Sequence, residues 1–228
     1  MINNKDGILN RVTGKKTYQF RGALLDWYAK HGRVFPWREN TASIYDIIIA
    51  EILLQRTQAE TIERFYQDFI NTFPSWEDIA KTGEKELANF LKPIGLWRRR
   101  SVTLIALARE MVKNNGVFPR QREKIEALPG IGQYIANAVL LFNYSIPQPL
   151  LDVNMARVLE RVFGPRKLAD IRYDNYLQTL SKEVVKCKKP REINWAILDL
   201  AATICRRNSP LCDECPVRDI CLYFGLSN

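Results

Sequence analysis

Apolar residues recur at helical spacing along almost the whole chain, and no stretch alternates strictly between apolar and polar positions as a half-buried strand does. The pattern predicts an all-α fold. Ser43 and Ser75 each begin a helix with a capping signal. A long helix from about Arg99 ends at Asn114-Asn115-Gly116, and another, 154–163, ends at Gly164-Pro165.

Two short helices, 121–127 and 133–143, flank a glycine-rich turn, Leu128-Pro129-Gly130-Ile131-Gly132. Glycines allow close backbone approach, so the amides of the turn and of the second helix can point toward one anion. A tight corner without a ligand gives the same pattern. Prolines and polar residues then cluster at 144–149, which predicts a domain boundary near Pro147. We expect one helical domain over 39–146 and a second formed by 1–38 with 147–228.

The composition is that of an ordinary globular protein, with 46% hydrophobic and 26% charged residues among 228. No apolar run is long enough to span a membrane, and the N-terminus has no secretory pattern, so we expect a cytoplasmic protein with no membrane partner. The net charge is +9, with basic clusters in 1–38 and at Arg98-Arg99-Arg100. This excess favours a polyanionic partner, although such runs are also common on solvated surfaces.

Three groups of residues are candidates for chemistry. Glu51 lies among apolar residues at helical spacing, so we expect burial to raise its pKa toward that of a general acid, unless its carboxylate reaches the helix edge. Asp152 precedes a helix and is a natural N-cap. Four cysteines follow the spacing C-x6-C-x2-C-x5-C, which indicates a metal site in a reducing compartment, zinc being the generic choice: Cys205, Cys212, Cys215 and Cys221.

Taken together, the motifs LPGIGQYIANA, LDVNMARV, EILLQRT and the cysteine spacing make the chain resemble the helix-hairpin-helix DNA glycosylases of the endonuclease III and MutY class. The resemblance implies two helical domains with the active-site cleft between them. It also implies that the hairpin grips the phosphate backbone through Leu128, Gly130, Gly132 and Gln133. In this class the four cysteines hold a structural 4Fe-4S cluster in a C-terminal loop.

The resemblance also assigns catalytic roles. Asp152 corresponds to the carboxylate that stabilises the cationic sugar as the base departs, and Glu51 to the acid that assists the leaving base. Tyr134 stands where the bifunctional branch has the lysine that attacks the sugar, which implies a monofunctional enzyme with little strand cleavage. The residues expected to open the duplex around a flipped base are Gln55, Arg56, Trp97 and Arg98.

The base that is removed follows less directly. Ala59 and Tyr134 resemble the thymine-DNA mismatch branch, and the chain ends soon after Cys221, where adenine-removing relatives continue into a second large domain. Trp195 fits neither branch, and we place it with Ala59 at the base pocket. We therefore expect a monomeric, nucleoid-associated base excision repair enzyme that removes thymine or uracil opposite guanine in double-stranded DNA. The alternatives are an adenine glycosylase acting opposite guanine or oxidised guanine, and a non-catalytic mismatch-binding protein.

Overall fold

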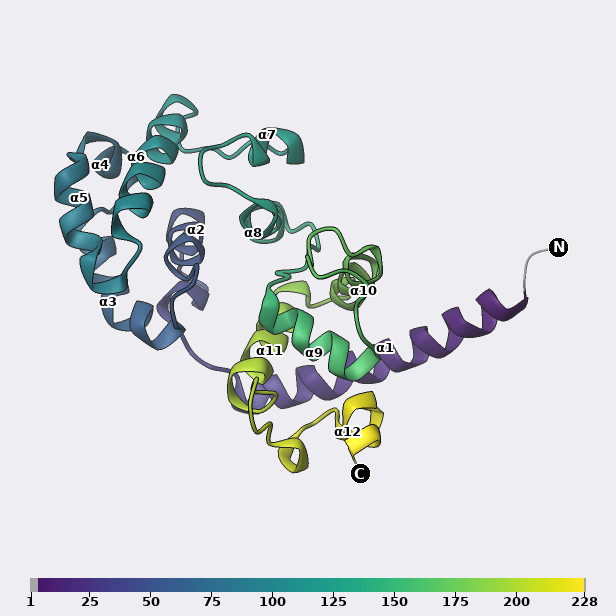
Figure 1. Ribbon diagram of the computed structural model, residues 1–228. Helices are drawn as coiled ribbons and strands as arrows, with labels where there is room; N and C mark the ends of the chain where they lie inside the picture. The colour runs from purple at the N-terminus through teal and green to yellow at the C-terminus, as the bar shows by residue number, and fades with distance from the viewer. Residues whose placement is uncertain (1–3, 228) are drawn as a thin grey trace. The chain divides into compact units, whose positions relative to one another are not determined.

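The computed structural model describes residues 4–227, with side chains from 14 to 226, and this part of the chain contains helices and no strand (Figure 1). The all-α prediction is therefore confirmed. The α-helices are α1 Asn4–His31, α2 Ile44–Leu53, α3 Ala59–Thr72, α4 Trp76–Lys81, α5 Glu84–Leu91, α6 Trp97–Lys113, α7 Arg122–Glu126, α8 Gln133–Tyr144, α9 Val153–Phe163, α10 Asn175–Val185, α11 Pro190–Thr203 and α12 Leu222–Ser227. Short 3-10 turns are η1 Pro36–Arg38, η2 Lys92–Ile94, η3 Cys212–Glu214 and η4 Arg218–Ile220.

The predicted start and stop signals lie where the helices begin and end. Ser43 and Asp46 form the reciprocal capping box of α2, and the Ser75 hydroxyl accepts from the amide of Asp78 at the start of α4. Helix α6 ends at a left-handed pair, Asn115 and Gly116, with φ values of 53° and 73°. Local chemistry therefore sets these ends independently of tertiary packing.

The chain folds into two compact units. Residues 34–146 form the central unit, and residues 1–33 with 147–228 form the terminal unit. The first boundary lies at residue 33 rather than 38, because Phe35 and Trp37 are buried in the central unit. Their rings stack at 4.7 Å, and Trp37 meets Tyr66 of α3 edge-on at 5.1 Å.

In the central unit, α4 and α5 pack against α6, while α2 packs against α8. Every residue of α2 from Ile47 to Leu53 is buried, including the one acidic residue, Glu51. A cluster of phenylalanines fills the space between α3 and α5, with ring centroids 5.1 to 6.1 Å apart: Phe65, Phe69, Phe73 and Phe90. The α2–α8 contact brings Glu51 next to α8, the helix that follows the glycine-rich turn.

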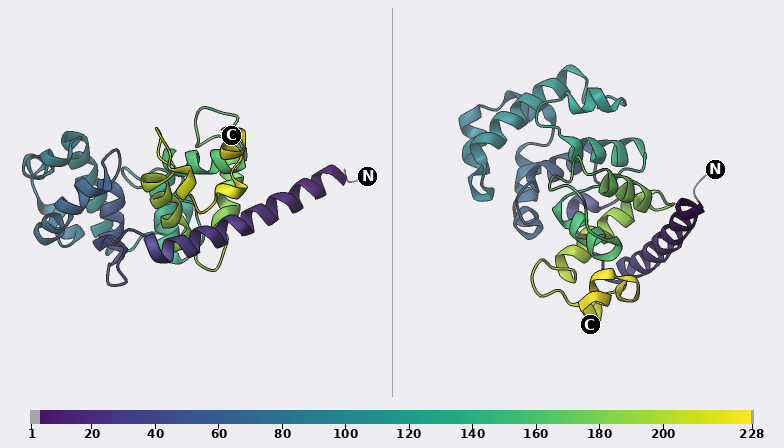
Figure 2. Two further views of the ribbon diagram at one scale, coloured as in Figure 1. Left: turned by 90° about the horizontal axis from the view of Figure 1, so that it is seen from below. Right: turned by 45° about the vertical axis from the view of Figure 1, so that its right-hand side comes forward.

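In the terminal unit, α11 packs against both α1 and α9, and α12 packs on α9 (Figures 1 and 2). The Asp199 carboxylate is fully buried and accepts from the backbone amide and the Nε of Arg33, both at 2.9 Å. A buried carboxylate needs such a paired partner. The pair fixes the last residue of the N-terminal segment to α11, directly before the chain enters the central unit.

Candidate active site

Two of the predicted catalytic residues meet in the central unit. Glu51, on α2, is only 5% exposed, which confirms the predicted burial. The Tyr134 hydroxyl, on α8, donates to Oε2 of Glu51 at 3.0 Å. This hydrogen bond joins α8 to α2 at the carboxyl group of Glu51. The sequence identified both residues but did not predict this bond, because the partners are separated by 83 positions.

The glycine turn has the geometry that its sequence suggests. Gly130 adopts φ +74°, and a Cβ built on it would lie 2.0 Å from Cγ2 of Thr103 on α6. Ile131 is buried, and its amide donates to the carbonyl of Leu128 at 3.1 Å. Gly132 is the N-cap of α8 and has no side chain with which to cap the helix. The first amides of α8 are thus suited to an anion.

Asp152 lies in the terminal unit as the N-cap of α9. Its carboxylate accepts from the backbone amides of Asn154 and Met155 at 2.9 and 2.8 Å, and from Nδ2 of Asn154 at 2.7 Å. Burial raises the pKa of Asp152, although these hydrogen bonds and the charge of Arg157 act against the rise. The capping role is confirmed, and it leaves the carboxylate held in one orientation by three donors.

The predicted duplex-opening residues lie in two places in the central unit, the loop after α2 and the first turn of α6. Gln55 and Arg56 are exposed after α2, while Trp97 is half-buried at the start of α6. The Arg98 guanidinium lies 4.5 Å from the Trp97 ring centroid, and Lys92 Nζ lies 5.7 Å from it. This combination of aromatic surface and positive charge is suited to nucleic acid.

The predicted basic cluster at 98–100 is wrong at its third member. Arg98 and Arg99 are exposed, but Arg100 is only 6% exposed and points into the protein. Leu96 was not predicted as a site residue, yet it is 46% exposed in a left-handed conformation with φ 51°. Consecutive residues of a helix point in different directions, so one of three adjacent arginines can be buried while the others are exposed. Because all three residues are arginine, the sequence does not indicate which one is buried.

The predicted base-pocket residues lie in different units. Ala59 is the first residue of α3 in the central unit and is half-buried. Trp195 lies on α11 in the terminal unit and is also half-buried.

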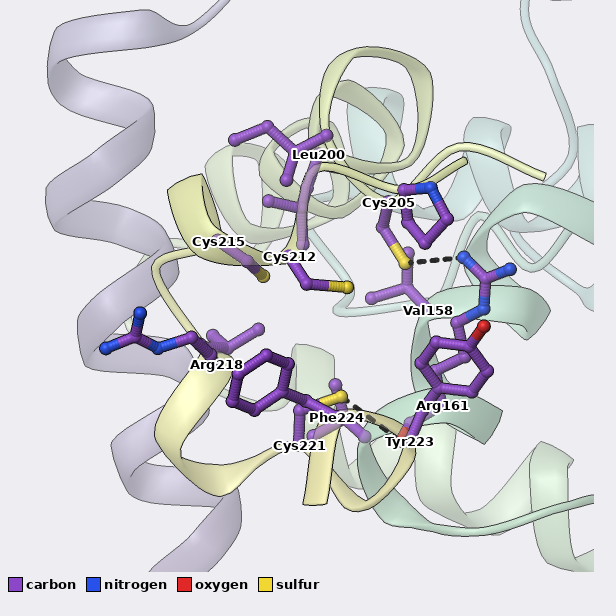
Figure 3. A pocket seen from close by; sticks show the side chains of 14 residues that line it. Val158, Arg161, Leu200, Cys205, Cys212, Cys215, Arg218, Cys221, Tyr223 and Phe224 are labelled. Atoms are coloured by element: carbon purple, nitrogen blue, oxygen red, sulfur yellow. Dashed lines mark hydrogen bonds between the residues drawn. The ribbon is translucent and has the colours of Figure 1, made fainter. Parts of the chain in front are cut away.

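The four cysteines of the C-terminal motif face one pocket of the terminal unit, which Arg161, Tyr223 and Phe224 also line (Figure 3). Arg161 Nη1 donates to Sγ of Cys205 at 3.4 Å. Burial raises the pKa of the Cys215 thiol to about 11, and the other three cysteines add to the rise. Four thiolates at these positions therefore require a compensating positive charge.

Among the residues that the structure describes, no three His, Cys, Asp or Glu side chains stand close enough together to hold a single metal ion. Over the same part of the chain, no helix is both long and apolar enough to cross a membrane.

The central unit contains a helix, a glycine turn and a second helix, and the terminal unit contains an aspartate-capped helix and a cysteine loop. This combination is typical of helix-hairpin-helix DNA repair proteins. The chain belongs to the HhH-GPD superfamily of base excision DNA repair proteins, whose family profile matches residues 49–186. The resemblance inferred from the motifs is therefore confirmed.

Relatives match nearly the whole chain. It is 38% identical over 211 residues to the thymine-DNA glycosylase of Aeropyrum pernix, covering 90% of this chain and 94% of that protein. It is 34% identical over 218 residues to the thymine/uracil-DNA glycosylase of Methanothermobacter thermautotrophicus, covering 95% and 98%. The structure of a thermostable thymine-DNA glycosylase superposes with a TM-score of 0.83 at 34% identity, covering 94% of this chain and 99% of the other.

Proposed function

We propose that this protein is a monofunctional DNA glycosylase that hydrolyses the N-glycosidic bond of thymine or uracil opposite guanine. The observation that carries the proposal is the buried Glu51 carboxylate held by the Tyr134 hydroxyl at 3.0 Å. A buried acid beside the hairpin is a costly feature without a chemical use. The target base is supported by similarity along almost the whole chain to proteins named thymine-DNA and thymine/uracil-DNA glycosylases.

The reaction breaks the bond between C1′ of the sugar and the base, and the bonding electron pair leaves with the base. Glu51 supplies a proton to the departing base, so the leaving group need not carry a full negative charge. The Tyr134 hydroxyl keeps the Glu51 carboxyl group oriented during this transfer. Asp152, held by its three donors, stabilises the positive charge that develops on the sugar.

A water molecule then adds to C1′, and its proton restores Glu51. The products are the free base and an abasic site in an intact strand. Tyr134 has no amine with which to form a Schiff base, so strand cleavage is not part of the reaction.

DNA binding uses the hairpin for the phosphate backbone and a second group of residues for the opened base pair. The turn and the first amides of α8 contact phosphate, through the segment from Leu128 to Gln133. Gln55, Arg56, Trp97 and Arg98 act where the base leaves the stack. Ala59 and Trp195 contribute to the base pocket. The protein works as a monomer on chromosomal DNA and is therefore nucleoid-associated.

We also propose that Cys205, Cys212, Cys215 and Cys221 hold a structural 4Fe-4S cluster. The four donors are all thiols and face one common pocket (Figure 3). Each thiolate of such a cluster binds a different iron atom, so the sulfurs need only face a shared space. Purified protein should be yellow-brown, with broad absorbance in the visible blue. Colourless protein carrying stoichiometric zinc would contradict the cluster.

The glycosylase proposal is tested with labelled duplexes containing T·G, U·G, A·G and adenine opposite oxidised guanine, each treated with hot alkali after incubation. We expect strand breaks with T·G and U·G, and only after alkali. Breaks confined to the adenine substrates would identify an adenine glycosylase. Tight mismatch binding without any product would identify a binding protein instead. Asp152→Asn protein serves as the control for contaminating activity.

A further inference from the structure

We propose that Arg100 is a positioning residue that fixes the spacing of two exposed loops which enter the duplex. The inference rests on the proposed function, since it concerns how the same enzyme opens its substrate. The first loop, 54–58, joins α2 to α3. The second, 94–97, runs from the last residue of η2 through Gly95 and Leu96 to the first residue of α6.

The guanidinium of Arg100 is buried between these loops. Nη1 donates to the carbonyls of Ile94 and Gly95 at 2.7 and 2.8 Å. Nη2 lies within hydrogen-bond distance of three acceptors on the other side, and its two hydrogens are shared among them. These acceptors are the carbonyls of Leu53 and Gln55, at 2.9 and 2.6 Å, and Oγ1 of Thr57, at 2.7 Å.

Two of these carbonyls lie directly before residues in a left-handed conformation. The carbonyl of Gln55 precedes Arg56, with φ 59°, and that of Gly95 precedes Leu96, with φ 51°. Side chains other than glycine adopt this conformation only at a cost in free energy, so the surrounding structure must hold it. One cation binds the peptide group before each of the two residues. Arg100 therefore fixes the backbone of both loops at their tips.

The two tips present complementary chemistry to DNA. Arg56 is exposed and cationic, and Leu96 is apolar and 46% exposed. The carbonyl of Leu53, which Arg100 also binds, ends the helix that carries Glu51. The same guanidinium thus binds both tips and the end of the helix that carries Glu51. A change in the position of Arg100 would move the loops with respect to Glu51.

Lysine cannot replace this arrangement. Arginine presents five N–H groups in a planar fork, whereas an ammonium is a single point on a flexible stem. Arg100→Lys keeps the positive charge at the end of α2, but its ammonium has three N–H groups for the five acceptors that the guanidinium binds. The substitution therefore separates the positioning role from a charge effect.

The first measurement needs no DNA and is independent of the proposed activity. In Arg100→Lys protein, hydrogen exchange should rise in the amides of 54–58 and 94–97, while α8 keeps its protection. Arg109→Lys is the matched control, because Arg109 is exposed on the same helix. Unchanged exchange in both loops would overturn the proposal, whatever the enzyme proves to excise.

The second measurement compares single-turnover excision of thymine paired with guanine against thymine opposite an abasic-site analogue, where the base is already unpaired. Arg100→Lys should lower the rate on the paired substrate by about a hundredfold, as misplacement of positioning groups by 1 Å can do. The rate on the unpaired substrate should fall much less. Equal losses on both substrates would indicate a structural role only. Failure of the parent protein on both would instead contradict the glycosylase proposal.

Thr57→Val provides a second variant if Arg100→Lys does not fold. It keeps the side-chain shape but removes one acceptor of the guanidinium. We expect the same preference for the unpaired substrate, to a smaller extent. An unchanged ratio of the two rates in this variant would also contradict the positioning role.

Discussion

Gly130→Ala tests the hairpin at the point where its turn touches the rest of the central unit. The added Cβ would lie 2.0 Å from Cγ2 of Thr103 and 3.5 Å from its Cβ, and the residue would keep φ +74°. Threonine is stiff about χ1, so its methyl group cannot move freely away. The substitution therefore forces the turn away from α6, or the Thr103 side chain out of its rotamer.

The expected loss in unfolding free energy has two parts. Overpacking costs about 1 to 3 kcal/mol, and a left-handed residue with a Cβ costs about 1 to 2 kcal/mol. The sum is about 2 to 5 kcal/mol, against a total stability of about 5 to 15 kcal/mol for a typical protein. Thr103→Ala removes the methyl group that clashes, so in that background only the conformational part, about 1 to 2 kcal/mol, should remain.

The assay is a double-mutant cycle by urea unfolding of the parent, both single variants and the double variant. Affinity for an abasic-site duplex, measured in parallel, should fall in Gly130→Ala protein and recover in part in the double variant, because the turn regains its position. Strictly additive free energies would refute the reasoning, since they would mean that the turn and Thr103 do not meet.

Three further predictions concern the chemistry. Asp152→Asn should abolish excision while duplex binding survives, because asparagine keeps the cap and loses the charge; turnover within about tenfold of the parent would exclude the charge as a main source of stabilisation. Excision should also fail in acid as Asp152 becomes protonated, and because its pKa is raised, the pH–rate profile should bend above the ordinary aspartate value of 3.8. Cys212→Ser should lower the thermal stability of the terminal unit, while the amides around Glu51 in the central unit keep their protection; melting followed by hydrogen exchange would show both effects.

Much of the fold follows from local signals in the chain. The capping residues Ser43 and Ser75 and the Asn115-Gly116 stop act within one helical turn, so the sequence alone locates them. The boundary at residue 33 was not predictable in the same way. The turn-like sequence around Pro36 does not reveal that Trp37 is held by Tyr66, because that contact joins distant parts of the chain.

The site divides along the same line. Glu51 is identifiable because a charge within an apolar helix face is anomalous by itself. Arg100 stands out only after folding, when five acceptors from the end of α2 and the two loops surround one guanidinium. Leu96 is an ordinary leucine in the sequence, and only its positive φ and its exposure set it apart. Non-local contacts therefore determine the parts that sequence patterns leave out.

Because the Tyr134 hydroxyl binds Glu51, a substitution at position 134 changes both the covalent chemistry at the sugar and the environment of the Glu51 carboxyl group. Tyr134→Lys should give protein that borohydride traps on DNA, whereas the parent should form no covalent adduct, because only an amine forms a Schiff base. The same substitution removes the hydroxyl that donates to Oε2 of Glu51 at 3.0 Å, so the carboxyl group loses the bond that orients it. The variant should therefore gain trapping and lose excision rate together, and Tyr134→Phe should lose excision rate without any trapping. Efficient trapping of the parent would show that another amine reaches the sugar and would contradict the monofunctional assignment.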